Sequence, residues 1–476
     1  MRPRTLLVLF LLVAGLASFI WFVEGDLPGT DERSELALKL LPFERQKIVR
    51  LTIEHPAAGV EERIVFERPG ETAGESAGEA EWRMVEPVTA RADVGAVESL
   101  LDQLDSLEKE RTFDDGQAES LGLAPPRAVI SISDGQVERR LLIGGDVPAS
   151  ESMIAALETT GPFHVVARAA WTEVDRSTDE WRERKVFPGG REDIERLVLV
   201  RGDDRLAMAP RGDDYFIETP LVDRVDEGTI SRFLDALEGL EVAEFIDGEL
   251  ALDASLGFAA PPRALEVSIR GRDAPWRLDL GRVSEGAEGE DEGRTVVVRV
   301  GGHVYRVNDS FGDGFERPIQ EWRSLEWSGR QVYEIDRLEV RDTSGTMVLA
   351  SEAGDWQRDG IKIEYSATSD LLHAITGMKA EALDAEAAIE GPPIFSATIN
   401  SGDAQQVLEV FAPTRDAYPA TASDRESTLW LGGESVRSLL SKVAAVRAAP
   451  PLAEAAPADE AVDVPEALSG PAADPN

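Results

Sequence analysis

The sequence contains no cysteine, and its 49 basic residues include only seven lysines. Without cysteine the chain cannot form disulfides, use a thiol nucleophile, hold a cysteine-ligated zinc or iron–sulfur site, or carry the acylated cysteine of a lipoprotein. No lysine follows a glycine, so a phosphate-binding P-loop is missing and ATP hydrolysis by that route is excluded. No H-E-x-x-H zinc motif occurs either.

The charge balance is strongly acidic, with a formal net charge of −41 and a pI near 4.4. Phosphate backbones and anionic lipid surfaces bind cationic footprints, so this balance argues against nucleic acid and an anionic membrane surface as direct partners. Few lysines beside many acids fit either salt adaptation or GC-rich codon usage, and the composition leaves both open.

What is present begins with an apolar N-terminus. Arg2 and Arg4 precede an uncharged run, Thr5–Val23, which is long enough to span a bilayer. The basic flank predicts that the N-terminus stays in the cytoplasm and that the rest of the chain is extracytoplasmic, in the periplasm or its equivalent. A cleaved signal peptide is the alternative, because Gly15-Leu16-Ala17 offers small residues at a suitable spacing. The apolar run continues past that site, which favours an uncleaved anchor.

An internal repeat organises the remainder. The pattern Ile-x-Arg-Leu-x-aliphatic occurs at Ile48–Ile53, Ile194–Leu199 and Ile335–Val340. A period of roughly 140 residues is too long for a solenoid unit and fits three tandem domains. Two further signals recur: an aromatic residue five positions before a proline (Trp82 and Tyr215), and a Pro-Pro pair before an alternating segment (Pro125-Pro126, Pro261-Pro262 and Pro392-Pro393).

Each copy predicts strands, one amphipathic helix and then more strands. Apolar residues at helical spacing follow Asp93 and Asp226, which are well placed as N-caps, and a shorter helix is predicted after Asp370 in the third copy. We therefore expect an α+β fold of three tandem repeats with mainly antiparallel strands, following an N-terminal transmembrane helix.

Composition sets the predicted boundaries. An Ala, Pro, Glu and Asp tail is too polar and too Pro-rich to pack, and the copies are expected to meet near Gly190 and Gly329. The predicted organisation is 1–24 for the basic flank and anchor, 25–43 for a juxtamembrane linker, 44–190 for the first repeat, 191–329 for the second, 330–447 for a divergent third, and 448–476 for a disordered tail.

Few residues suggest chemistry. The four histidines are His55, His164, His303 and His373. We place His164 and His303 at matching strand positions, so duplication and packing explain them without a metal. No pair of carboxylates stands out as a hydrolase pair by spacing or apolar setting. The repeated Trp and Tyr side chains fit a core, although stacking on a sugar or lipid is the alternative.

Asp309, Asp313 and Glu316 flank a glycine-rich turn that superficially resembles a calcium loop. Gln320 stands where an EF-hand needs a bidentate acid, so we favour a solvated turn. The acidic run Glu285–Glu292 is likewise expected to face water. The sequence therefore predicts no catalytic, cofactor-binding or metal-ligating residue.

At its motifs the chain resembles a bacterial family of domains of unknown function, number 4340. The resemblance covers the first two copies and rests on these segments: Trp82 to Pro87, Asp93 with its Leu-rich helix, Leu121–Pro126, Ile143-Gly144, and Trp181–Lys185. The third copy lacks the Trp-Arg close.

The resemblance implies a function that the residues alone do not. Family members often have one N-terminal transmembrane segment and are encoded beside ABC-transporter permeases and gliding-motility-type auxiliary subunits. The chain is thus expected to be a membrane-anchored extracytoplasmic accessory protein rather than an enzyme, with an ABC permease and auxiliary subunits as partners and no nucleotide or cofactor. A cell-envelope structural protein or glycan or lipid binder is the alternative, and an envelope hydrolase using paired carboxylates is a further one.

Overall fold

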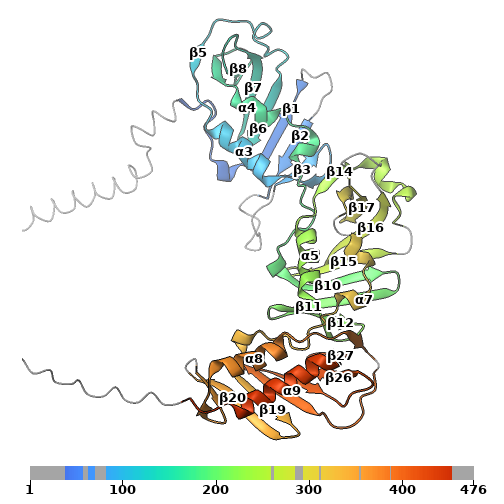
Figure 1. Ribbon diagram of the computed structural model, residues 1–476. Helices are drawn as coiled ribbons and strands as arrows, with labels where there is room; N and C mark the ends of the chain where they lie inside the picture. Colours follow the sequence, from blue (N-terminus) through green and yellow to red (C-terminus); the bar gives the residue numbers. More distant parts are fainter. Residues whose placement is uncertain are drawn as a thin grey trace, which may run out of the picture. The chain divides into compact units, whose positions relative to one another are not determined.

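Antiparallel β-sheets dominate the computed structural model, which describes residues 38–56, 63–69, 82–258, 262–284, 293–309, 312–352, 355–385 and 387–452 (Figure 1). The strands form three nine-stranded sheets. The chain divides into two compact units between Val186 and Phe187. The first unit holds the first sheet, and the second unit holds the other two.

The first sheet has neighbouring strands in the order β4-β3-β2-β1-β6-β7-β8-β9-β5. One face carries the helix α3 (Val94–Asp105), and a short helix, α4 (Ala169–Val174), packs against α3. The strands are β1 (Arg50–Glu54), β2 (Arg63–Glu67), β3 (Arg83–Glu86), β4 (Ala90–Arg91), β5 (Arg111–Phe113), β6 (Ala128–Ser133), β7 (Glu138–Asp146), β8 (Ser152–Ala156) and β9 (Phe163–Ala167).

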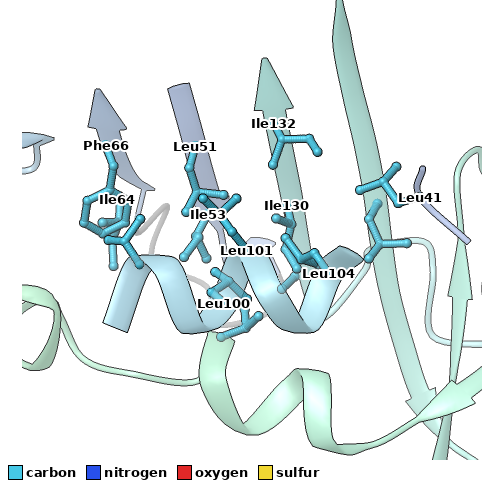
Figure 2. Close-up of a cluster of buried hydrophobic side chains, with 14 of the residues drawn as sticks. Leu41, Leu51, Ile53, Ile64, Phe66, Leu100, Leu101, Leu104, Ile130 and Ile132 are labelled. Carbon is cyan, nitrogen blue, oxygen red and sulfur yellow. The ribbon is translucent and has the colours of Figure 1, made fainter. Parts of the chain in front are cut away.

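The first core forms where α3 crosses the centre of this sheet. Leu100, Leu101 and Leu104 lie on one side of the helix because residues three and four apart share a helical face. Figure 2 shows them facing Ile53 and Ile130 of the central strands β1 and β6, and all five are fully buried. The helix begins at Asp93, whose carboxylate accepts a 2.9 Å hydrogen bond from the Ala96 amide.

The second sheet repeats this strand order as β13-β12-β11-β10-β15-β16-β17-β18-β14. Its helix α5 (Glu227–Glu238) is capped by Asp226, which accepts a 2.8 Å hydrogen bond from the Thr229 amide. Two short helices, α6 (Gly312–Glu316) and α7 (Ile319–Trp322), follow the last strand. The strands are β10 (Ile194–Arg201), β11 (Asp204–Arg211), β12 (Asp214–Thr219), β13 (Asp223–Arg224), β14 (Val242–Ile246), β15 (Arg263–Ile269), β16 (Trp276–Ser284), β17 (Thr295–Val300) and β18 (His303–Asn308).

The third sheet has the order β22-β21-β20-β19-β24-β25-β26-β27-β23. It carries two helices in contact with each other, α8 (Tyr365–Thr376) and the longer α9 (Gly433–Ala448) (Figure 1). The strands are β19 (Arg337–Asp342), β20 (Gly345–Glu352), β21 (Asp355–Arg358), β22 (Ile361–Lys362), β23 (Ala382–Asp384), β24 (Phe395–Ser401), β25 (Ala404–Val410), β26 (Ala417–Ala422) and β27 (Thr428–Gly432).

The three Ile-x-Arg-Leu segments supply β1, β10 and β19, which hold the same place in their sheets. Their leucines Leu51, Leu197 and Leu338 are fully buried. Because successive side chains of a strand lie on opposite faces, every second residue of the motif faces the helix. The motif therefore marks the inward face of a central strand.

The predicted α+β class is wrong. Each sheet has nine strands and a single twelve-residue helix at the place of α3, so the protein is mostly β. The sequence interpretation missed the edge strands β5, β14 and β23, which are too short or too polar to show a clear alternation. It also missed α9, whose apolar residues Val436, Leu439 and Val443 are buried.

The third-copy helix also differs from the prediction. It begins at Tyr365, not after Asp370, and it is as long as α3 and α5. The position equivalent to the capping aspartates is Glu364, which makes no side-chain cap hydrogen bond. Because no aspartate stands at this position, the prediction placed the start of the helix at the next aspartate, Asp370.

The predicted transmembrane helix over Thr5–Val23 lies outside the described residues. Within the described ranges, no helix is both long and apolar enough to cross a membrane. The domain boundaries at Gly190 and Gly329 remain predictions.

Candidate interaction sites

A buried cluster of charged side chains in the second unit connects the second and third sheets. The second sheet contributes Asp223 and Arg224 from β13, together with Arg323, which follows α7. The third sheet contributes Asp424 and Arg425 from the turn between β26 and β27. Asp223 is 0% exposed and Arg425 7% exposed, so neither charge is solvated as it would be at the surface. We call these five residues the Asp223 cluster.

Asp223 is the centre of this cluster. Its carboxylate accepts hydrogen bonds of 2.5 Å from Arg323 Nε and from the Ser427 hydroxyl, and it forms an ion pair with Arg425. The Arg224 amide also donates to it at 2.8 Å. A buried carboxylate is stable only when such donors replace its lost hydration.

Arg425 also binds the backbone of the segment that links the two sheets. Its guanidinium donates to the Glu326 carbonyl oxygen at 3.0 Å and to the Ser324 carbonyl oxygen at 2.8 Å. Burial lowers the pKa of Arg425, and the neighbouring Asp223 carboxylate opposes that shift. One side chain thus ties the turn of the third sheet to both Asp223 and the linker.

Arg224 extends from the second sheet to Asp424, with which it forms an ion pair. Burial acts to raise the pKa of Asp424, but the charge and hydrogen bond of Arg224, with a 3.0 Å hydrogen bond from Gln406, leave it below its ordinary value. Asp214 shows the opposite outcome, because burial raises its pKa and the more distant Arg224 and Arg330 only partly offset this. Of the two carboxyl groups, the environment of Asp424 therefore favours its ionised form, whereas that of Asp214 disfavours it.

A groove of about 950 Å³ lies in the first unit. Its lining comes from the segment before β1, the ends of β1 and β6, the strand β7, and the turn between β8 and β9. Val129 and Leu142 give it an apolar part, while Glu54, Glu138 and Glu158 give it carboxylates. Leu157 at its rim is 42% exposed.

The histidines do not converge. His164 is buried on β9, where its Nδ1 lies 3.0 Å from the Thr112 hydroxyl, and burial lowers its pKa. His55 is buried at the end of β1 against Trp171, with ring centroids 6.1 Å apart. His373 lies on α8, where its Nδ1 is 2.8 Å from the Ser369 carbonyl oxygen. No cluster of three or more potential metal ligands occurs among the described residues.

The predicted equivalence of His164 and His303 is wrong. On the edge strands, Thr112 pairs with His164 and Phe245 pairs with Tyr305. Thr112 and Phe245 lie five positions after the buried Leu107 and Leu240, which follow the two helices identically. Tyr305 is therefore the counterpart of His164. His303 lies two residues before Tyr305 on the same strand and stacks against it, with ring centroids 6.4 Å apart.

The calcium-like loop is held by arginine. Asp309 accepts a 2.5 Å hydrogen bond from the Gly312 amide and pairs with Arg294 at 2.8 Å. Glu316 lies 3.7 Å from Arg294 as well. A cation already neutralises these acids, which supports a structural turn. The Asp313 side chain and the run Glu285–Glu292 fall outside the described part, and Gln320 lies in α7.

The repeated tryptophans belong to the cores. Trp82, Trp181 and Trp322 are at most 1% exposed. Trp82 donates its indole N–H to Glu98 at 2.7 Å and lies under the Arg68 guanidinium. The backbone of the Trp-Arg segments pairs with the start of each helix, because Trp181 and Trp322 accept from the amides of Asp93 and Asp226. Stacking on a sugar or lipid is thus excluded for these three rings as they stand.

One further sequence pattern is typical of a hydrolase nucleophile. Gly74–Gly78 spells G-x-S-x-G, but it falls in the range 70–81, which is not described. A nucleophile elbow requires a strand followed by a helix. Here the flanking strands β2 and β3 pair with each other in antiparallel register, so the segment connects a hairpin.

The family comparison adds an identity to part of this architecture. Residues 82–261 match the model of the family described as domain of unknown function (DUF4340). This stretch belongs to the DUF4340 family. The DUF4340 match begins just before β3 and ends just before β15, so it joins the later strands of the first sheet to the earlier strands of the second. Searches of curated proteins and of solved structures gave no match.

The Asp223 cluster was not predicted. Its residues are far apart in the sequence, so no short motif contains them. Asp223-Arg224 falls inside the DUF4340 match, whereas Arg323, Asp424 and Arg425 fall outside it. In a chain with 90 acidic residues, Asp-Arg neighbours are commonplace. Only the fold brings positions that are 200 residues apart in sequence into one hydrogen-bonded group.

Proposed function

We propose that this protein is a membrane-anchored, extracytoplasmic accessory protein that serves as an interaction scaffold for an ABC-type transporter complex and has no catalytic activity of its own. The membrane anchor is the predicted span over Thr5–Val23, and the transporter link follows from the gene neighbourhood of the family that the sequence resembles. Both are proposals.

The observation that supports a scaffold most directly is the Asp223 cluster. All of its described charges bind groups of the same chain, and they connect two sheets through the linker that separates them. Buried ion pairs contribute little net stability compared with apolar packing, but they accept only one geometry. A protein that must present successive sheets at a set spacing gains from such a junction.

The experiment is affinity purification of the full chain from detergent-solubilised membranes. The proposal expects a permease and its ATPase to be recovered together with the tagged protein. The matched control is an otherwise identical chain in which residues 5–23 are replaced by a transmembrane segment of unrelated sequence. Recovery with both versions assigns the association to the extracytoplasmic sheets, whereas recovery of the protein alone from intact membranes would contradict the transporter link.

Topology is tested separately. Alkaline phosphatase fused after Asn476 should be active, because the fusion would lie outside the cytoplasm, and a cytoplasmic fluorescent reporter at the same place should be dark. The reverse result would contradict the extracytoplasmic location.

A further inference from the structure

The third sheet offers a surface that receives part of the second sheet. We call it the receiving surface, and its residues are Ser328, Gly329, Gln406, Asp424 and Arg425. The β12–β13 hairpin of the second sheet lies against it, with Arg224 paired to Asp424 and Asp223 paired to Arg425. Ser328 and Gln406 are at most 2% exposed there. The hairpin thus shows what kind of element this surface takes.

The groove of the first unit occupies the position on the first sheet that the receiving surface occupies on the third. The Leu40 amide donates to the Leu107 carbonyl oxygen as the Trp327 amide donates to that of Met378. Leu107 and Met378 each follow the helix of their sheet with the same backbone hydrogen bond. The next two residues therefore correspond, so that Leu41 and Pro42 stand for Ser328 and Gly329.

The strand register gives the third correspondence. Leu51 pairs with Ile132, which pairs with Arg139. Leu338 pairs with Ile399, which pairs with Gln406. Both leucines are those of the Ile-x-Arg-Leu motif, so Arg139 stands for Gln406.

The turn before the last long strand completes the set. Ala155 pairs with His164, and Ala420 pairs with Leu429, across connections of equal length. Thr159 and Thr160 therefore stand for Asp424 and Arg425. All five counterparts of the receiving surface, Leu41, Pro42, Arg139, Thr159 and Thr160, line the groove.

The third sheet ends in a hairpin that corresponds to the inserted one. β22 pairs with β21 as β13 pairs with β12, so Ile361 and Lys362 stand for Asp223 and Arg224. The Leu452 amide donates to the Lys362 carbonyl oxygen as the Ser324 amide donates to that of Arg224. Ile361 is 46% exposed and Leu452 49%, whereas Asp223 and Ser324 are at most 3% exposed.

The groove and the β21–β22 hairpin differ from the receiving surface and the β12–β13 hairpin in the residues at equivalent positions. In the groove, Leu41 and Leu157 replace Ser328 and Ala422, and on the hairpin Ile361 replaces Asp223. Lys362 keeps the positive charge of Arg224 and pairs with Asp355 at 2.8 Å, while the groove carries Glu54, Glu138 and Glu158 beside Arg139 and Arg140. Three of the four ion-pair positions thus hold uncharged residues, Thr159 and Thr160 in the groove and Ile361 on the hairpin, and the fourth, Lys362, can meet the carboxylates of the groove. These are complementary surfaces at the two ends of one chain.

We propose that the groove of the first unit binds the β21–β22 hairpin of a second copy of this chain, head to tail. The contact repeats the junction between the second and third sheets, with Lys362 near Thr159 in place of Arg224 near Asp424. Because the two surfaces differ, the contact is heterologous and can extend to chains of more than two copies.

Bismaleimide cross-linking tests the geometry, and the natural absence of cysteine makes every introduced thiol unique. Full-length Thr159→Cys and Lys362→Cys proteins, purified in detergent, are mixed. The proposal expects a cross-linked dimer from the mixture and none from either variant alone. Leu252→Cys, 85% exposed and outside both surfaces, replaces Lys362→Cys as the matched control and should give none.

Sedimentation velocity of the unmodified full chain tests the association itself. Concentration-dependent oligomers are expected, and they should strengthen with salt because the net charge of −41 makes copies repel at low ionic strength. Leu157→Glu and Ile361→Glu should each weaken association roughly tenfold or more by placing a charge in the apolar contact, and Leu252→Glu should not.

Three results would overturn the proposal. A monomer at all concentrations is one. A Thr159→Cys self-cross-link, which indicates a symmetric dimer, is another. The third is a Thr159→Cys thiol that is shielded from maleimide in the monomer, which would assign the groove to a segment of the same chain. None of these depends on the transporter, so the proposed function is tested independently.

Discussion

The guanidinium of Arg224 occupies the place that a Cβ atom of Gly329 would need, so position 329 has no room for a side chain. Arg224 belongs to the second sheet, and Gly329 lies in the linker that enters the third. The absence of a side chain at one residue therefore allows the buried arginine to reach Asp424 across the junction.

Gly329→Ala should destabilise the second unit by about 1–3 kcal/mol, because the added methyl group must displace a buried guanidinium. Urea unfolding followed by tryptophan fluorescence measures this. Gly293→Ala is the matched control, since a Cβ there meets no atom within 4 Å. Equal effects of the two substitutions would show that backbone entropy, not the arginine contact, decides the outcome.

Arg425→Met should be more damaging, by about 3–5 kcal/mol, because it removes one of the two arginines that pair with the buried Asp223 carboxylate. The double variant Asp223→Leu, Arg425→Met removes both charges and should lose less than the sum of the two single variants. The same urea measurement gives the coupling free energy. Strict additivity would contradict a shared network.

The helix caps offer a comparison at three equivalent positions. Asp93→Ala and Asp226→Ala should each cost about 1 kcal/mol, because both carboxylates accept a first-turn amide hydrogen bond. Glu364→Ala should cost less, since Glu364 makes no side-chain cap bond. Thermal unfolding by circular dichroism ranks the three, and a loss at Glu364 as large as at Asp93 would contradict the cap assignment.

His164 should make the first unit sensitive to acid. Burial lowers its pKa from the ordinary value of 6.5. A depressed folded-state pKa means that the neutral ring stabilises the fold above the unfolded value, and this stability is lost as the pH falls through the folded value. His164→Gln should therefore flatten the stability profile of the first unit below about pH 6.5. Urea midpoints across this range measure it, and His373→Gln, which lies in the second unit, is the control that should leave the slope of the first unit unchanged.

Much of the secondary structure was predictable from local pattern. The alternating segments predicted after the three Pro-Pro pairs are the strands β6, β15 and β24, because side chains on opposite faces of a strand leave a period of two in the sequence. The helices behind Asp93 and Asp226 were found because a capping carboxylate precedes residues of period 3.6. Where the cap is missing, at Glu364, the prediction misplaced the helix start.

The fold class was not predictable in the same way. A nine-stranded sheet depends on edge strands such as Arg111–Phe113, whose partner Phe163–Ala167 lies some 50 residues away in sequence. Pairing of this kind is specified by long-range hydrogen bonds rather than by a local period. The misassigned histidine pair has the same origin, because only the pairing with Thr112 and Phe245 shows that Tyr305, two positions after His303, corresponds to His164.

The sequence by itself determined the absence of cysteine and P-loop chemistry, the acidic surface, and the three central strands that the Ile-x-Arg-Leu motif marks, because composition and short-range periodicity are properties of the chain alone. Only the tertiary structure decided which charges are buried and which surfaces correspond. Asp223 and Arg425 look like any surface pair in the sequence, and they form one cluster because the fold removes water from both. The correspondence between the first-unit groove and the receiving surface of the third sheet likewise follows from strand register. Register depends on pairing between distant segments and cannot be read from neighbouring residues.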